Sequence, residues 1–208
     1  MFTGIVMSRG TVLEALPLGG DLRLRIHSGS ISLDDCMEGD SIAVAGVCLT
    51  MLQPRGLEFF ADVSAETLAL TTLGTLQVNS TVNLELALTL QDRLGGHLVS
   101  GHVDGMGKLL GRHEEGRAER FEFELPHTLA RYVASKGSIT IDGVSLTVNE
   151  VRDNEFSVCL IPHTLQVTTL GKLQRGHQVN IEVDLVARYL ERLLSISADF
   201  KDKSRSES

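Results

Sequence analysis

GVCLT at residues 46–50 returns as GVSLT at residues 143–147, an offset of 97 positions with a single change. The same offset holds without a gap over residues 4–88. The other words that it superimposes are Thr67-Leu68 on Thr164-Leu165, TTLG (71–74) on TTLG (168–171), Val82-Asn83 on Val179-Asn180, and Gly4 and Val6 on Gly101 and Val103. A repeat of this length is too long for a solenoid unit, so it predicts two duplicated small domains.

Length and charge narrow the class of protein. The 208 residues suffice for two domains, each large enough to build a core without disulfides or metals. The net charge of −8, without clusters of Lys and Arg, argues against a nucleic-acid partner.

The cysteines and the first residues bear on the compartment. Cys36, Cys48 and Cys159 are odd in number and form no CxxC pair, which favours a reducing compartment over a disulfide framework. The start, MFTGIV, lacks the pattern of a secretory signal, and no apolar run approaches a membrane span. We therefore expect a soluble, cytoplasmic protein with no membrane partner.

Alternating apolar residues predict β-strands in both halves. LRLRI at 22–26 and VNLELALTL at 82–90 alternate, Ser41–Thr50 is a further apolar run, and HEEG at 113–116 reads as a hairpin tip. Because open sheet edges are a liability, we expect each half to close into a Greek-key barrel. Short helices are expected at Ser64–Leu70, capped by Ser64, and at Pro126–Ala134.

The chain after Leu185 has no counterpart in the first half. Its apolar residues Val186, Tyr189, Leu190, Leu193 and Leu194 fall at helical spacing. Such a helix needs a surface to cover, either its own barrel or sister chains, and both alternatives are open. Residues 201–208 are expected to be disordered.

Positions shared by the two halves outline a pocket. Glycine allows a backbone to approach a flat ligand, and hydroxyls and main-chain amides can read its polar edge. The alternative is that these residues are only turns and caps of a duplicated barrel. The shared pairs are Gly4 and Gly101, Thr50 and Thr147, and Thr67 and Thr164.

Positions that differ between the halves are more informative. Cys48 falls on Ser145, Ile5 on His102, Ala87 on Asp184 and Gly39 on Lys136. If both halves bind the same molecule, they bind it in unlike chemical surroundings. A lone cysteine is, however, more often a core residue than a nucleophile.

Two histidines lie at the junction, in LGGHLVSGH. His97 and His102 are five residues apart with no third ligand nearby, so a metal site is disfavoured and acid–base work or polar anchoring is favoured. Phe2 is either core packing or an aromatic that stacks on a planar ring.

Six stretches in this order resemble the riboflavin synthase family of the alpha-chain, lumazine-binding-repeat type. They cover residues 1–195 together with the duplication. These stretches are MFTGIV (1–6), GVCLT (46–50), ETL with TTLG (66–74), LGGHLVSGHVDG (94–105), KGSITIDGVSLTVNEV (136–151) and LIPHTL with TTLG (160–171).

The resemblance implies an all-β fold of two tandem six-stranded Greek-key barrels plus a C-terminal α-helix. The domains would be 1–97 and 98–184, a trimerisation helix at 185–200 and a tail at 201–208. The implied activity is a transferase of riboflavin biosynthesis. It moves a four-carbon unit between two molecules of 6,7-dimethyl-8-ribityllumazine, giving riboflavin and 5-amino-6-(ribitylamino)uracil, without cofactor or metal.

The implied assembly is a homotrimer, with lumazine synthase left open as a further partner. The reactive pair would form between the N-terminal barrel of one chain and the C-terminal barrel of the next. The short connection at residues 90–97 spans at most about 3.3–3.6 Å per residue, which favours pairing across chains.

The resemblance also implies the site. Cys48 and Ser145 would lie near the carbon that accepts a nucleophile, His102 would carry protons, Asp184 would hold ribityl hydroxyls or the partner ring, and Phe2 would pack at the site. Whether Cys48 or water attacks is open. Ser41, Asn83 and His97 would be supporting polar groups at the site. The first barrel's binding shell would be Gly4, Ile5, Val6, Cys48, Leu49, Thr50, Asp62, Val63, Ser64, Ala65, Glu66 and Thr67. The second barrel's would be Gly101, His102, Val103, Lys136, Ser145, Leu146, Thr147, Ile161, Pro162, His163, Thr164, Leu165 and Gln166.

Two residues depart from the family pattern. Ala45 stands where Asn is common, and Ala65 where a polar residue is common, both beside the first pocket. A non-catalytic lumazine- or flavin-binding protein is the alternative function, and a structural β-barrel module is a third. The retained His97, His102, Ser145 and Thr147 favour the enzyme.

Overall fold

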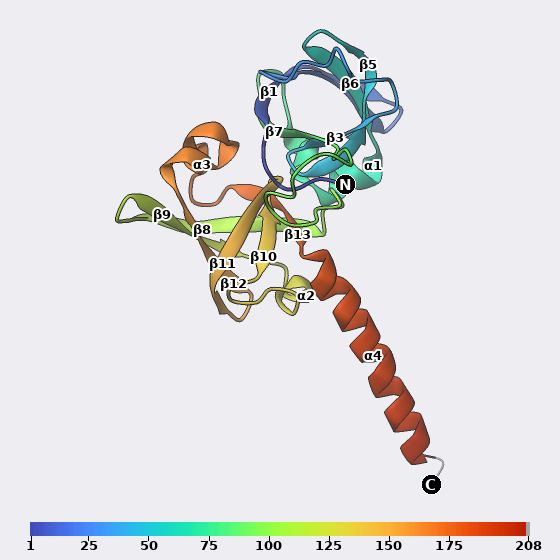
Figure 1. Ribbon diagram of the computed structural model, residues 1–208, viewed down its shortest axis with the longest axis vertical. Coiled ribbons are helices and arrows are strands. Elements are labelled where there is room, and N and C mark those ends of the chain that lie inside the picture. Colours follow the sequence, from blue (N-terminus) through green and yellow to red (C-terminus); the bar gives the residue numbers. More distant parts are fainter. Residues whose placement is uncertain (207–208) are drawn as a thin grey trace.

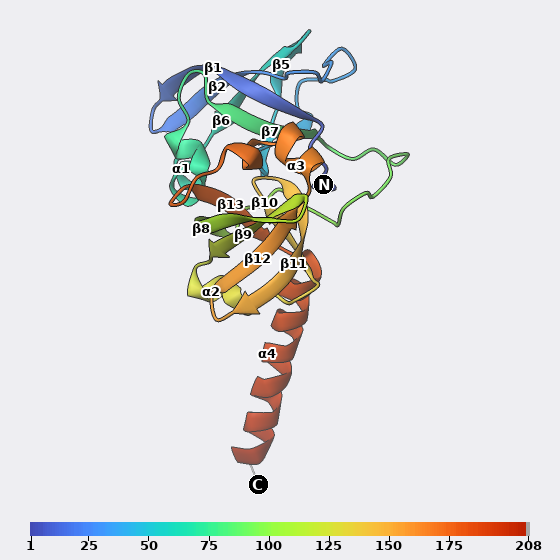
Figure 2. The same cartoon turned by 90° about the vertical axis from the view of Figure 1, so that its left-hand side faces the viewer.

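The computed structural model describes the backbone of residues 1–206 and the side chains of residues 1–195. Two β domains pack against each other, and one long helix projects away from the second (Figures 1 and 2). This arrangement agrees with the duplication and the separate terminal helix that the sequence predicts.

The second half is a closed six-stranded barrel, as predicted. Its strand order is β10-β11-β12-β9-β8-β13, and the last strand pairs back with the first. The strands are β8 (Gly105–Glu115), β9 (Ala118–Glu124), β10 (Ser138–Ile141), β11 (Val144–Arg152), β12 (Glu155–Leu160) and β13 (Gln178–Val183).

The first half repeats this strand order in a seven-stranded half-barrel sheet and not in the closed six-stranded barrel that the sequence predicts, because one strand is divided. Its sheet runs β4-β3-β7-β1-β2-β6-β5, and its two end strands are consecutive in the chain, joined by Met51. Together β4 and β5 match β11 at the 97-residue offset. The strands are β1 (Ser8–Leu18), β2 (Asp21–His27), β3 (Ser41–Val44), β4 (Val47–Thr50), β5 (Leu52–Arg55), β6 (Glu58–Val63) and β7 (Thr81–Leu86).

The apolar pattern of Ser41–Thr50 indicates one continuous strand. The structure instead shows a hairpin of β3 and β4. Ala45 and Gly46 form its turn with φ of 47° and 80°, and Asp142 and Gly143 repeat these angles in the second half. A two-residue turn of this kind needs positive φ at both central positions, for which Asp-Gly is a strong signal. The turn chemistry therefore overrides the apolar run.

A short helix follows β6 in the first half and its equivalent, β12, in the second. In α1 the hydroxyl oxygen of Ser64 accepts a hydrogen bond from the amide of Thr67, as the capping pattern predicts. The predicted helix at 126–134 is shorter. The elements are α1 (Ala65–Leu70), 3₁₀ helix η1 (Thr72–Thr75), α2 (His127–Ala130), α3 (Pro162–Val167) and η2 (Thr169–Lys172).

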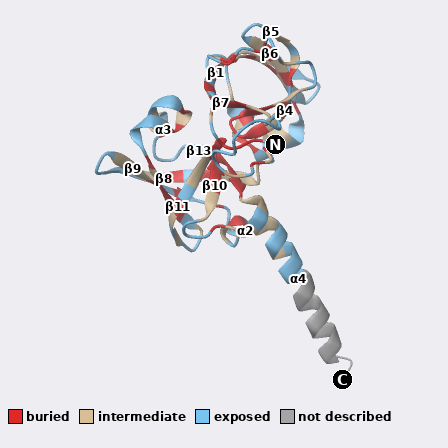
Figure 3. Cartoon of the chain, in the orientation of Figure 1, coloured by how far each residue is buried: buried red, intermediate tan, exposed pale blue. Residues whose placement is uncertain are grey.

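Each half has its own hydrophobic core, and buried residues are coloured red on the strands of both halves in Figure 3. In the second half, Phe123 stacks between Phe121 and Phe156, with ring centroids 6.1 and 5.5 Å apart. Each half therefore has the packing of a separate folded unit.

The long helix α4 (Leu185–Ser206) leaves the second barrel, and apolar residues of its first turns are exposed. Val186, Tyr189 and Leu190 are between 54% and 68% exposed, so packing on the chain's own barrel is not their role. The first turns of the helix are tied to the second half by ion pairs of Arg188 with Asp104 and of Arg131 with Glu191.

The predicted tail at 201–208 overlaps the last turns of α4, and residues 207 and 208 lie outside the described residues. The predicted boundary between residues 97 and 98 falls between β7 and β8. Among the described helices, none is long and apolar enough to cross a bilayer.

Candidate functional site

The two halves meet through the turns of their matching hairpins. A Cβ placed on Gly46 would lie 2.6 Å from the amide nitrogen of Gly143, and one on Gly143 would lie 2.9 Å from that of Gly46. Real Cβ atoms do not approach backbone so closely. The glycines of GVCLT and GVSLT are therefore required by the contact between the halves as well as by their positive φ.

Two buried asparagines cross this interface symmetrically. Asn83 donates from its side-chain amide to the carbonyl oxygen of Asp142 (2.9 Å) and accepts from the amide of Thr169 (2.8 Å). Asn180 donates to the carbonyl of Ala45 (2.8 Å) and accepts from the amide of Thr72 (2.7 Å). That Asn83 supports a bound ligand stays a prediction. What the structure shows is that its side chain hydrogen-bonds across the interface between the two halves.

The departure at Ala45 leaves this interface intact. Ala45 takes part only through its backbone: its carbonyl accepts from Asn180, and its amide donates to Asn83. Ala65 likewise donates its amide to a carboxylate oxygen of Asp21 (2.9 Å) while its side chain is exposed. Neither alanine removes a contact that the structure shows.

Asp142, the counterpart of Ala45 in the second repeat, is buried. One of its oxygens accepts from the amide of Asn180 (2.8 Å), yet burial raises the pKa of the carboxyl from 3.8 to about 7. Because the folded state disfavours the charged form, the free energy of unfolding falls as pH rises between these two pKa values. The slope is at most about 1.4 kcal/mol per pH unit.

We expect Asp142→Asn to remove this pH dependence, since Asn keeps the accepting oxygen and carries no charge. Urea unfolding at pH 5 and pH 8 measures it: the variant should gain stability over the wild type at pH 8 and little at pH 5. Asp153→Asn is the matched control, because Asp153 also has a positive φ but is exposed. Equal pH slopes for wild type and Asp142→Asn would contradict the expectation.

The segments before the first strand of each half cross to the other half. The carbonyl oxygen of Gly4 accepts from the amide of Ser145 (2.7 Å), and that of Gly101 accepts from the amide of Cys48 (2.8 Å). Val6 packs on the core of the second half, and Val103 packs on the core of the first.

This crossing corrects the grouping of the binding shells. We expected Gly4–Val6 beside Cys48–Thr50, and Gly101–Val103 beside Ser145–Thr147. The structure exchanges them, because each crossing segment pairs its backbone with the strand of the opposite repeat. Offsets along a sequence match equivalent residues, but they do not say which half a segment packs against.

Cys48 has apolar surroundings. It packs against a small cluster of Phe2, Ala43 and Val99, with Ala87 beside it. Phe2 is completely buried and bridges to Val99, so its ring packs beneath Cys48 and is not an open stacking face. The aromatic residue at position 2 is thus part of the apolar packing around Cys48.

Ser145 occupies the equivalent position with polar surroundings. Its hydroxyl shares a hydrogen bond with Nδ1 of His97 (2.7 Å), whose Nε2 shares another with the hydroxyl of Thr140 (3.2 Å). Burial lowers the pKa of His97, while the negative charge of Asp184 opposes that shift. Burial therefore favours the neutral imidazole, which is hydrogen-bonded to Ser145 and Thr140 and feels the charge of Asp184.

Thr140 was missed by the sequence reasoning. It falls on Ala43 at the 97-residue offset, so the same comparison that singled out Ser145 against Cys48 would have found it. The same offset gives four pairs of unlike residues around these two positions: Phe2 and Val99, Ala43 and Thr140, Cys48 and Ser145, and Ala87 and Asp184. In three of them the second half carries the more polar residue.

The other predicted site residues are of two kinds: some have exposed side chains, and others have side chains packed in a core. Exposed ones that can meet a ligand include His102, Thr50, Thr147 and Ile161. The side chains of Leu49 and Val63 point into the first core, so only their backbone is available. Ser41 lies opposite Thr50 in the β3–β4 hairpin.

Two charged candidates have notable geometry. Lys136 is exposed with φ of 67°, where its counterpart Gly39 has 100°, and a non-glycine residue in this region stores strain. Asp62 accepts two hydrogen bonds from Arg23 (2.6 and 2.7 Å), and this partner lowers the pKa of its carboxyl. A hydroxylated ligand at Asp62 would therefore meet an ion pair and not a free carboxylate.

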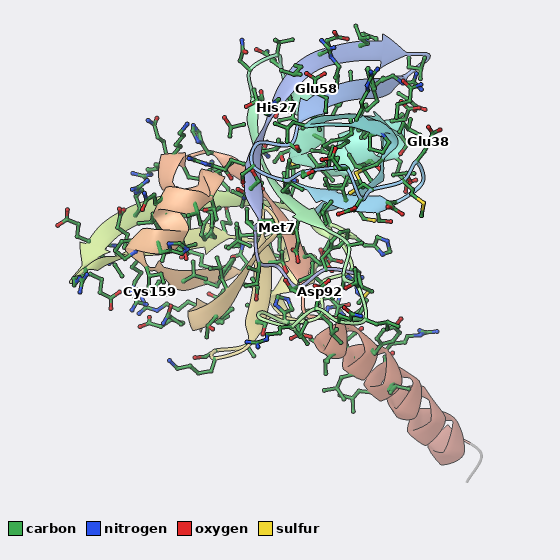
Figure 4. All side chains as sticks on the ribbon, turned by 45° about the horizontal axis from the view of Figure 1, so that its top comes forward. Met7, His27, Glu38, Glu58, Asp92 and Cys159 are labelled. Carbon is green, nitrogen blue, oxygen red and sulfur yellow. The ribbon has the colours of Figure 1, made fainter. Side chains whose placement is uncertain are left out.

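A groove runs beside the Gly4 segment. Ile5, which is 49% exposed, lines it together with Met7, Glu85, Ala87 and Asp92. Figure 4 labels Met7, near the junction of the halves, and Asp92, on the chain that connects them. Among the described residues, no cluster of His, Cys, Asp and Glu could hold a metal ion.

Comparison with known families places the repeats. The lumazine binding domain matches twice, at residues 3–87 and 100–184. The chain is 50% identical over 200 residues to a riboflavin synthase of Mycobacterium tuberculosis, covering 93% of this chain and 98% of that protein. It is 42% identical over 196 residues to one of Photobacterium phosphoreum, covering 94% and 90%.

Solved structures agree in fold. LumP complexed with 6,7-dimethyl-8-(1'-D-ribityl) lumazine has a TM-score of 0.78 at 26% identity, and LumP complexed with riboflavin has 0.80 at 28%. Each match covers 88% of this chain and 99% of LumP.

Proposed function

The chain belongs to the riboflavin synthase family, and on that premise we propose that it converts two 6,7-dimethyl-8-ribityllumazine molecules into riboflavin and 5-amino-6-(ribitylamino)uracil. One lumazine gives up a four-carbon unit and the other accepts it. The observation that carries the proposal is the pair of equivalent positions in the two halves, with Cys48 in apolar surroundings and Ser145 in a polar cluster with His97 and Thr140.

A dismutation needs this asymmetry. Its two substrates are identical, so the protein must make one the donor and the other the acceptor, and a duplicated fold with altered side chains does so. Bringing two bound substrates together is itself a large catalytic contribution, on the order of 7–11 kcal/mol when the geometry is good.

Roles follow from chemistry at the two pockets. His102, exposed on the segment that crosses to Cys48, is the proton carrier for the acidic methyl group of a lumazine. Cys48 and Ser145 lie near the ring carbon that accepts a nucleophile, which is either the Cys48 thiol or water. Asp184, whose charge acts on His97, holds ribityl hydroxyls or the partner ring, and Phe2 supports Cys48 from below.

The function is tested by incubating the purified chain with the ribityllumazine alone. We expect flavin absorbance to appear without added cofactor or metal, with one riboflavin formed for every two lumazines consumed. A stable lumazine complex without turnover would contradict the proposal and would instead favour a binding protein like LumP.

The proposal includes a cytoplasmic homotrimer in which donor and acceptor meet between chains. It is supported by the exposed apolar residues in the first turns of α4, since a helix with such residues needs a partner surface. Lumazine synthase, whose name describes a source of the proposed substrate, is the further partner that the family resemblance raises.

We expect a chain that ends at Leu185 to be monomeric, because it lacks the exposed residues of α4. Light scattering of the full and shortened chains measures this, with circular dichroism to show that both barrels remain folded. Replacing exposed Leu57, which lies outside the helix, by Ser is the control and should leave the assembly unchanged. A trimer that persists without α4 would contradict the expectation.

A further inference from the structure

We propose that Glu85 and Glu182 are positioning residues, each of which sets the crossing segment that completes the pocket of the opposite half. The inference rests on the proposed function, because it assumes that the Cys48 and Ser145 pockets hold the two lumazines. It adds that each pocket is controlled by a carboxylate whose own strand belongs to the other barrel.

Glu85, on β7, holds the first crossing segment. Its Oε1 accepts from both the amide and the hydroxyl of Thr3 (2.6 Å each), and its Oε2 accepts from the amide of Gly4 (2.9 Å). The residue is only 5% exposed. A buried carboxylate is an acceptor without donors, so it can satisfy three N–H and O–H groups at once, and such charge-assisted bonds are strong.

Glu182, on β13, repeats this arrangement at the 97-residue offset. Its Oε1 accepts from the amide (2.7 Å) and the hydroxyl (2.6 Å) of Ser100, and its Oε2 accepts from the amide of Gly101 (2.9 Å). It is 3% exposed. This contact therefore occurs twice in the chain, in the same geometry.

Each clamped segment reaches into the other half. Beyond Glu182, the hydroxyl oxygen of Ser100 accepts from the amide of His102 (3.3 Å), and the carbonyl of Gly101 accepts from the amide of Cys48. Beyond Glu85, the hydroxyl oxygen of Thr3 accepts from the amide of Ile5 (3.1 Å), and Gly4 accepts from Ser145. Glu182 of the second barrel thus sets His102 against the Cys48 pocket of the first.

The geometry gives a selective substitution. In Glu182→Gln the side-chain oxygen can still accept from Ser100, but the new NH₂ group faces the N–H of Gly101, and two donors cannot bond each other. The same holds for Glu85→Gln and Gly4. Glu122→Gln on β9 is the matched control, because Glu122 is exposed on the outer face of the barrel.

The test is amide hydrogen exchange of the full chain, read separately for residues 46–50 and 143–147. We expect Glu182→Gln to speed exchange about tenfold at 46–50, in the first half, and Glu85→Gln to do so at 143–147, in the second half. Glu122→Gln should change neither. Faster exchange in the half that carries the substitution, or in both halves equally, would overturn the inference and indicate a merely structural role.

Turnover gives the second readout. Both Gln variants should lower kcat/KM for the ribityllumazine at least about tenfold with the assembly intact, since each leaves one pocket misplaced. Unchanged kcat/KM beside a wild type that makes riboflavin would overturn the inference. If the wild type made no riboflavin, the proposed function would be contradicted. The inference about Glu85 and Glu182 would still be tested by hydrogen exchange, which does not depend on the reaction.

Milder variants keep the test open if a Gln variant does not fold. Ser100→Ala removes the hydroxyl that donates a hydrogen bond to Glu182 and accepts one from the amide of His102. Thr3→Ala removes the equivalent hydroxyl, which bonds Glu85 and the amide of Ile5. The same crossed pattern of exchange is expected at smaller amplitude. Its absence in both variants would also overturn the inference.

Discussion

Gly46→Ala is expected to destabilise the protein by about 3 kcal/mol. About 1 kcal/mol comes from placing a side chain at φ of 80°. The remainder comes from a Cβ only 2.6 Å from the backbone nitrogen of Gly143, which can be relieved only by moving the two barrels apart.

Gly56→Ala is the matched control for this prediction. Gly56 has φ of 61°, but a Cβ there would meet nothing within 4 Å. Urea unfolding should therefore show a loss of only about 1 kcal/mol for Gly56→Ala. Equal losses for the two variants would show that the barrels do not meet as described.

His102→Ala is expected to lower kcat about 100-fold or more if His102 moves the proton of the reacting methyl group. The side chain is exposed and its backbone is held by Ser100, so its removal should leave folding and assembly unchanged. Steady-state rates with the ribityllumazine, together with light scattering, make the measurement.

His113→Ala provides the comparison, because His113 is an exposed histidine on the β8–β9 hairpin, away from the crossing segments. It should keep the wild-type rate. If His102→Ala also kept that rate, His102 would have no part in proton transfer.

Much of the fold could be predicted from one repeated stretch. The offset between GVCLT and GVSLT carries β1 onto β8, β7 onto β13 and α1 onto α3 residue for residue. Even the positive φ angles at Gly4 and Gly101, and at Ala45 and Asp142, recur at this offset. Duplication makes such predictions strong because every signal is present twice.

The arrangement between the halves could not be predicted in this way. Neither the repeat period nor residue spacing shows that Gly4 bonds to Ser145 and not to the strand of its own repeat, because that choice depends on how the two folded halves dock. The division of one strand at Met51 was also hidden. Its second-half counterpart, Val148, continues without a break in β11.

The candidate site shows the same division. Comparing repeats found Cys48, Ser145 and Asp184, but the partners that give them their character, His97 on Ser145 and Phe2 beneath Cys48, become visible only in three dimensions. His97 lies outside both matched repeats, so a comparison of the repeats could not single it out.

The central claim is that one chain holds two like ligands in two unlike pockets, each completed by a segment from the other half. A crystal structure of the protein with an unreactive lumazine analogue tests it most directly. The account predicts two analogues per chain, one touching Cys48 and His102 and the other touching Ser145 and Ile5. One analogue per chain, with the second cradle filled by protein side chains, would contradict it.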